Sequence, residues 1–185
     1  MFFDQNTKIQ VRYMFAVWLF FFVACDQVIG LKKPEIEKGK KGMVLMVMVP
    51  DCPLSQNYST PFLKLKSQFE KDFNFWIVVP AKFYNHKEIE KFASEFEISK
   101  NNLFVDTKNQ YVKSINARIS PEFFLMDSLG QTRYQGAFDD WVETLGTKKI
   151  GKRKKKYLSS AIGQYLNQEA INPTYNKAEG CYLEL

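Results

Sequence analysis

The sequence is poor in histidine: His86 is the single residue of this type among 185. A Ser-His-Asp triad needs a histidine as its general base, and a histidine-based metal site needs several imidazoles. Neither is readily built from this chain. Cysteine is also scarce, with Cys25, Cys52 and Cys181 as the three examples. Because three is an odd number, at least one cysteine stays outside any internal disulfide and needs a separate explanation.

Long hydrophobic runs are lacking as well. Residues 13–24 form an apolar run of about a dozen residues, whereas a membrane-spanning helix needs about 20. The cations Lys8 and Arg12 precede this run, and Phe22-Val23-Ala24-Cys25 ends it. The arrangement resembles a bacterial lipoprotein signal, which implies export, lipidation of Cys25 and a membrane anchor facing the periplasm or the cell exterior. A plain signal anchor is the alternative.

The remaining chain divides by composition. Residues 26–41, DQVIGLKKPEIEKGKK, are polar and charged, which predicts a short tether. Hydrophobic residues make up 45% of the chain, and phenylalanine occurs 17 times, which indicates a globular protein with one sizeable core. Much of the net charge of +6 lies in residues 148–156. That run lacks interleaved aromatics, so we predict a solvated helix start, able to touch anionic lipid, rather than a nucleic-acid site.

The most informative stretch is an apolar run, Met43 to Val49, that leads directly into Pro50-Asp51-Cys52-Pro53. Helical periodicity follows, so the pattern predicts a buried strand running into a helix, with Cys52 at the junction. Pro53 suits the first helical position, where a missing N–H costs nothing. The dipole and free N–H groups of a helix start lower the pKa of a cysteine placed there. The alternative is a small apolar cysteine without a reactive role.

Apolar periodicity predicts alternating strands and helices along the rest of the chain. Strands are expected at residues 43–49, 73–79, 103–105, 123–126 and 132–135, and helices at residues 54–71, 86–98, 111–117 and 155–168. The last two strands form a hairpin, in which Gly130 suits the left-handed position of the turn. This order predicts an α/β fold with a mixed central sheet and helices on both faces.

Four short motifs carry a resemblance to a known family. They are CPLSQNYSTP from Cys52, ISPE at residues 119–122, FLMDSLG followed by YQGAFDD within residues 124–140, and AEGC ending at Cys181. Together they resemble the thioredoxin-fold redoxin domains of bacteria, of the peroxiredoxin-like (AhpC/TSA) type. The resemblance extends over most of residues 42–185. It implies a thioredoxin-like domain at residues 42–170 and a C-terminal tail at residues 171–185.

The resemblance also implies a redox site that uses no metal and no organic cofactor. Cys52 would be the nucleophile, and Cys181 in the tail would be the resolving thiol. The residues that would shape the pocket are Pro53, Ser55, Ser120 and Pro121, with the peptide bond before Pro121 in the cis form. The implied substrates are protein thiols and disulfides or small peroxides.

Two positions depart from related enzymes. Ser55 replaces the second cysteine of the Cys-x-x-Cys pair of disulfide reductases, and Val49 stands where peroxiredoxins carry a threonine that polarises peroxide. The sequence leaves open whether Cys52 and Cys181 form a resolving pair, a permanent structural disulfide or no bond at all. An inert binding or scaffolding lipoprotein is also open. So is copper binding by Cys52 with three methionines of the first strand, Met43, Met46 and Met48.

Overall fold

The computed structural model describes residues 32–144, 147–148 and 155–185 of the chain. The predicted signal, including Cys25, and most of the basic run lie outside the described residues. Within the described part, no helix combines the length and the apolar character that crossing a bilayer requires.

Six strands form the central sheet: β1 (Gly42–Val47), β2 (Phe73–Pro80), β3 (Leu103–Asp106), β5 (Glu122–Asp127), β6 (Thr132–Gly136) and β9 (Tyr175–Asn176). Their spatial order is β3-β2-β1-β5-β6-β9. The neighbours β1 and β2 are parallel, as are β2 and β3, whereas β5 runs antiparallel to both β1 and β6. The sheet is therefore mixed, as predicted.

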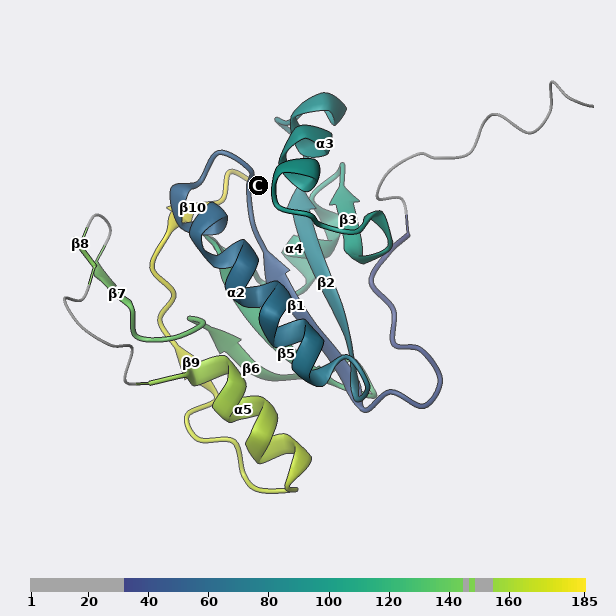
Figure 1. Ribbon diagram of the computed structural model, residues 1–185, viewed down its shortest axis with the longest axis vertical. Coiled ribbons are helices and arrows are strands. Elements are labelled where there is room, and N and C mark those ends of the chain that lie inside the picture. The colour runs from purple at the N-terminus through teal and green to yellow at the C-terminus, as the bar shows by residue number, and fades with distance from the viewer. Residues whose placement is uncertain (1–31, 145–146, 149–154) are drawn as a thin grey trace, which may run out of the picture.

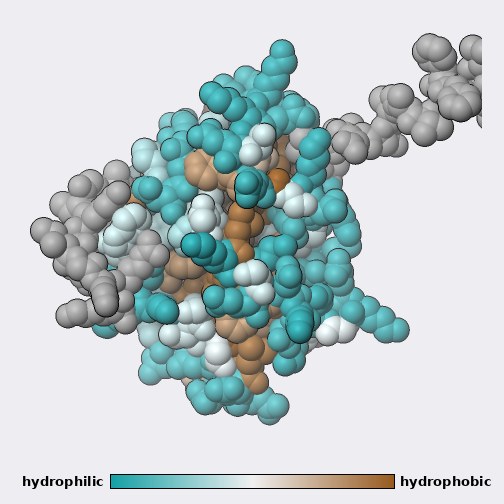
Figure 2. Space-filling model, in the orientation of Figure 1, coloured by the Kyte–Doolittle hydropathy of each residue, from teal (hydrophilic) through white to brown (hydrophobic). Residues whose placement is uncertain are grey.

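In the described part of the chain, four α-helices accompany the sheet: α2 (Pro53–Phe69), α3 (His86–Glu95), α4 (Gln110–Ser114) and α5 (Tyr157–Leu166). Helices α2, α3 and α5 share one core, and α4 contributes to a second core on the opposite face. Figure 1 shows α2, α3 and α5 in front of the sheet. On this face, apolar residues are visible only in gaps between hydrophilic side chains (Figure 2), because each helix turns its apolar side inward.

Strand β1 is buried along its whole length because its alternate residues enter the two cores. Met46 and the following Met48 belong to the core beneath α2, whereas Met43 belongs to the core on the other face. The three methionines therefore do not converge on one copper site, and their packing explains their presence.

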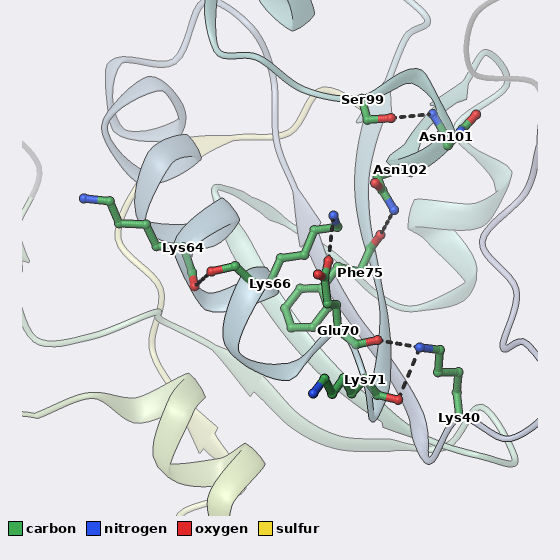
Figure 3. Close-up of polar contacts among 10 residues, drawn as sticks. Lys40, Lys64, Lys66, Glu70, Lys71, Phe75, Ser99, Asn101 and Asn102 are labelled. Atoms are coloured by element: carbon green, nitrogen blue, oxygen red, sulfur yellow. Dashed lines mark hydrogen bonds and ion pairs between the residues drawn. The ribbon is translucent and has the colours of Figure 1, made fainter.

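The segment before β1 packs more closely than a tether would. The indole N–H of Trp76 donates to the carbonyl of Glu35, and Ile36 packs against the second core. The ammonium of Lys40 donates to the carbonyls of Glu70 and Lys71, just beyond the end of α2 (Figure 3). Contacts of the domain thus begin before residue 42, within the segment predicted as a tether.

The C-terminal tail is also more regular than predicted. Strand β9 pairs with β6 at the sheet edge. Two further strands, β10 (Cys181–Tyr182) and β4 (Ile119–Ser120), pair with each other in antiparallel fashion. A separate antiparallel pair, β7 (Val142–Thr144) and β8 (Thr147–Lys148), was likewise not predicted. The tail therefore folds back across the domain and completes its sheet.

Candidate functional site

The predicted junction between β1 and α2 is present, and Cys52 is the N-cap residue of α2 with Pro53 as the first helical residue. The backbone of Cys52 is extended (φ −78°, ψ 117°), so the chain turns there from strand to helix. The side chain of Cys52 is 1% exposed. Its sulfur lies at the positive end of a 17-residue helix, where an anion is stabilised.

The tail brings Cys181 to Cys52. Pairing between β10 and β4 places Cys181 opposite Ser120, and the amide of Leu183 donates to the carbonyl of Arg118 at 2.9 Å. The Sγ atoms of Cys52 and Cys181 are 2.9 Å apart, and both residues are free thiols. Since an S–S bond is about 2.05 Å long, less than about 1 Å of movement separates these thiols from a disulfide.

Gly180 allows this approach. A Cβ atom built at this residue would lie 2.1 Å from the carbonyl oxygen of Ser120. No side chain fits at that distance, so the tail can lie against β4 only with glycine here. The peptide bond between Ser120 and Pro121 is cis, as the resemblance implies.

Hydrogen bonds connect the remaining predicted pocket residues. The hydroxyl of Ser120 accepts from the amide of Val49 at 2.8 Å and lies 2.8 Å from the hydroxyl of Ser55. Ser55 and Ser120 are fully buried. The carbonyl oxygen of Ser120 lies 3.1 Å from the sulfur of Cys52 and accepts its S–H when the thiol is protonated. These contacts fix the sulfur between α2 and the loop that contains Pro121.

The pKa values of the two thiols are shifted in opposite directions. Burial alone would raise the pKa of Cys52, but hydrogen bonds from the Cys181 thiol and from Ser55 to the thiolate bring that pKa below its usual range. For Cys181, burial, its hydrogen bond to Cys52 and the negative charges of Cys52 and Asp51 raise the pKa to about 12. Of the two thiols, Cys52 therefore ionises first, and its thiolate accepts a hydrogen bond from the Cys181 thiol.

A cleft of about 380 Å³ opens over the two sulfurs. Asp51 and Tyr84 line it, and the Tyr84 hydroxyl donates to Oδ1 of Asp51 at 2.6 Å. Two exposed aromatic side chains, Phe83 and Tyr182, also line the cleft. The sequence patterns do not indicate these four residues as members of the site. For Asp51, its position directly before Cys52 could have indicated a place in the site. Phe83, Tyr84 and Tyr182 are distant from Cys52 in the sequence and reach the cleft only through the tertiary fold.

Glu184 also lines the cleft, whereas the single histidine forms an ion pair on α3. His86 begins α3, and its Nδ1 atom is 3.5 Å from Glu90. Among the described residues, no group of three or more His, Cys, Asp or Glu side chains is placed to hold a metal ion.

Comparison with solved structures identifies the fold. An uncharacterized conserved protein from Geobacillus kaustophilus superimposes with a TM-score of 0.68 at 18% identity, covering 79% of this chain and 78% of that one. A hypothetical protein from Sinorhizobium meliloti gives 0.65 at 15% identity, covering 86% and 96%. A thioredoxin-like protein in its oxidized form gives 0.55 at 16% identity, covering 77% and 94%.

The chain therefore has a thioredoxin-like fold. No protein-family model matches the sequence. No curated protein matches it either.

Proposed function

We propose that this protein is a thiol-disulfide oxidoreductase in which Cys52 is the nucleophilic thiolate and Cys181 is the resolving thiol. The observation that carries the proposal is the 2.9 Å contact between two free thiols of opposite acidity. The thiolate is the reactive form of cysteine, and a second thiol within bonding reach is what resolves a mixed disulfide.

The proposed cycle moves two electrons. The Cys52 thiolate attacks a substrate disulfide, forms a mixed disulfide and releases the first substrate thiolate. The sulfur of Cys181 then bonds to Cys52, and the second substrate sulfur leaves. The substrate disulfide is reduced to two thiols, while the cysteine pair is oxidised to a disulfide. The reverse sequence oxidises substrate thiols, so the direction depends on the redox partner.

Protein thiols and disulfides are the proposed substrates, with small peroxides as a second class. A peroxide would convert Cys52 to a sulfenic acid, which Cys181 would resolve to the disulfide with release of water. Val49 lines the cleft and has no hydroxyl to polarise a peroxide. This observation favours disulfide exchange over efficient peroxide reduction.

We also propose that the protein is exported and held to a bacterial membrane by lipid on Cys25, facing the periplasm or the cell exterior. Support comes from the signal-like sequence that ends at Cys25. With Cys25 lipidated, Cys52 and Cys181 are the remaining thiols of the chain, in a compartment where disulfides persist.

The competing function is an inert binding or scaffolding module with a fixed disulfide between Cys52 and Cys181. A turnover assay separates the two. We expect the full chain to catalyse dithiothreitol-dependent reduction of insulin disulfides, and the Cys52→Ser variant to have no activity above background. Wild-type protein without catalysis, or a Cys52→Ser variant as active as the wild type, would overturn the proposed enzyme.

A further inference from the structure

Resolution of a mixed disulfide raises a problem of proton transfer at Cys181. This thiol must lose its proton to become a nucleophile. The mixed disulfide removes the charge of Cys52 and its hydrogen bond, but burial and the charge of Asp51 still raise the pKa of Cys181. A positioned proton acceptor removes that limitation. The question is which group in the cleft supplies it.

Asp51 is one of the carboxylates of this cleft. It lines the same cleft as Cys181 and directly precedes Cys52 in the chain. The Tyr84 hydroxyl holds Oδ1 of Asp51 at 2.6 Å, while Oδ2 makes no hydrogen bond to another residue of the described part. Burial and the carboxylate of Asp51 raise the pKa of Tyr84, so the hydroxyl stays protonated and continues to orient Asp51.

We propose that Asp51, oriented by Tyr84, accepts the proton that Cys181 loses when it attacks the mixed disulfide on Cys52. The inference rests on the proposed function and deepens it by assigning the proton acceptor of the resolving step. Asp51 is thus a catalytic group and Tyr84 a positioning residue. Both lie outside the set of residues that the sequence resemblance assigns to the site.

The electrostatics agree with this placement. The charge of Asp51 contributes to the raised pKa of Cys181 but is not among the causes of the shift at Cys52. The charge of Asp51 thus acts on the sulfur that must be deprotonated, with which it shares the cleft. In the resting pair, its charge keeps Cys181 protonated and available to stabilise the Cys52 thiolate.

The S–H bond of Cys181 breaks and its proton moves to the carboxylate of Asp51, while the sulfur forms the bond to Cys52. The bond between Cys52 and the substrate sulfur breaks, and the substrate leaves as a thiolate. Asp51 then passes its proton to that thiolate or to water. The cysteine pair has lost two electrons, and the substrate disulfide has gained them.

Among the described residues, the cleft that contains Cys181 has other ionisable groups besides Asp51. The thiolate of Cys52 is its bonding partner, and Glu184 lies on the same tail segment and lines the cleft. The Lys82 ammonium lies 5.1 Å from the ring centroid of Phe83, a residue of the cleft, and a cation accepts no proton. Tyr182 and Tyr84 carry phenol groups and are not carboxylates. Glu184 is therefore the carboxylate against which the role of Asp51 can be compared.

The test uses the reduced full chain and a dithiobis(nitrobenzoate) disulfide, whose thiol product absorbs visible light. Rapid mixing separates two releases of that product. The first reports attack by Cys52, and the second reports resolution by Cys181. A Cys181→Ser variant identifies the second phase by its absence. A Cys52→Ser variant measures any reaction of the other cysteines, which is subtracted.

For Asp51→Asn we expect the first phase to change less than threefold and the second to slow by about 100-fold at pH 7. The deficit should shrink toward pH 10, because hydroxide increasingly replaces the missing acceptor as pH approaches the pKa of Cys181. Tyr84→Phe should slow the second phase by a smaller factor. Glu184→Gln, the matched control, should leave both phases within twofold of the wild type.

If Asp51 acted only through its charge, the Asp51→Asn variant would change the rate of the second phase in the opposite direction. Removal of the charge would then lower the pKa of Cys181 and accelerate the second phase, and that result, or an unchanged rate, overturns the inference. Equal slowing at every pH would indicate a structural role and also overturns it. Absence of the first phase in wild-type protein would instead contradict the proposed function itself.

Discussion

The sulfur atoms of Cys52 and Cys181 lie 2.9 Å apart although 129 positions separate these residues in the sequence. Their contact depends on two short strands, β4 and β10, and on the close fit of Gly180 against Ser120. The helix start lowers the free energy of a thiolate at Cys52, and the tail supplies a thiol that donates to it. The pairing of β10 with β4 thus helps to lower the pKa of Cys52, because it positions the thiol that donates to the Cys52 thiolate.

Removal of the Cys181 thiol should raise the pKa of Cys52. In Cys181→Ala, the Cys52 thiolate loses the hydrogen bond that opposes the effect of burial. The measurement is the pH dependence of the rate at which iodoacetamide alkylates Cys52, with peptides identified by mass spectrometry. A midpoint that stays the same or moves to lower pH would contradict the assigned direction.

Ser55 should stabilise both the thiolate and the fold. Ser55→Ala removes a hydrogen bond to the Cys52 thiolate and leaves the buried hydroxyl of Ser120 with one partner fewer. We expect a higher pKa for Cys52 and a loss of about 1–3 kcal/mol in the free energy of unfolding, measured by urea titration. The control is Ser67→Ala, at an exposed hydroxyl on α2; equal losses in both variants would refute the prediction.

Substitution of Gly180 should separate the two thiols without unfolding the domain. In Gly180→Val, the new side chain collides with the backbone of Ser120, so β10 must move away from β4. Disulfide formation between Cys52 and Cys181 should slow by at least about tenfold, while far-ultraviolet circular dichroism stays unchanged. The control Gly163→Ala meets no atom within 4 Å and should stabilise α5 by about 0.5–1 kcal/mol. Rapid pairing in Gly180→Val would show that the fit of the tail is unimportant.

Stability of the reduced protein should fall between about pH 9 and pH 12 through Cys181. Its pKa rises from the ordinary value of 9.0 to about 12 on folding, so the unfolded chain releases this proton first. Between these values the unfolded state binds fewer protons than the folded state, and the free energy of unfolding decreases as pH rises. Because other groups also titrate there, the measured quantity is the difference between wild type and Cys181→Ser. A difference that does not vary with pH would contradict the shift.

The parts of the site close to Cys52 could be predicted because they depend on local sequence. The apolar run before Pro50 and the periodicity after Pro53 specify a strand and a helix, and a cysteine between them must lie at the helix start. The buried faces of β1 and α2 were likewise predictable from spacing, as Phe62 and Leu65 show in the core.

The parts that depend on tertiary contacts could not be predicted in the same way. Strands β4 and β10 contain two residues each, too few to form a periodic pattern, and only the resemblance placed Cys181 near the site. Tyr84 lies in an irregular segment between β2 and α3, and nothing in its local sequence indicates the hydrogen bond to Asp51. Residues 34–41 look like a tether in composition, yet contacts such as that of Ile36 attach them to the domain.

The central claim is that Cys52 and Cys181 form a reversible dithiol pair. The most direct test purifies the full chain without reductant and maps its disulfides by mass spectrometry before and after one equivalent of dithiothreitol, then of oxidised glutathione. We expect a peptide linked through Cys52 and Cys181 that opens with the reductant and forms again with the oxidant. A link that resists reduction would identify a structural disulfide. A Cys52 thiol that stays free and unreactive throughout would contradict the enzyme and favour the binding module.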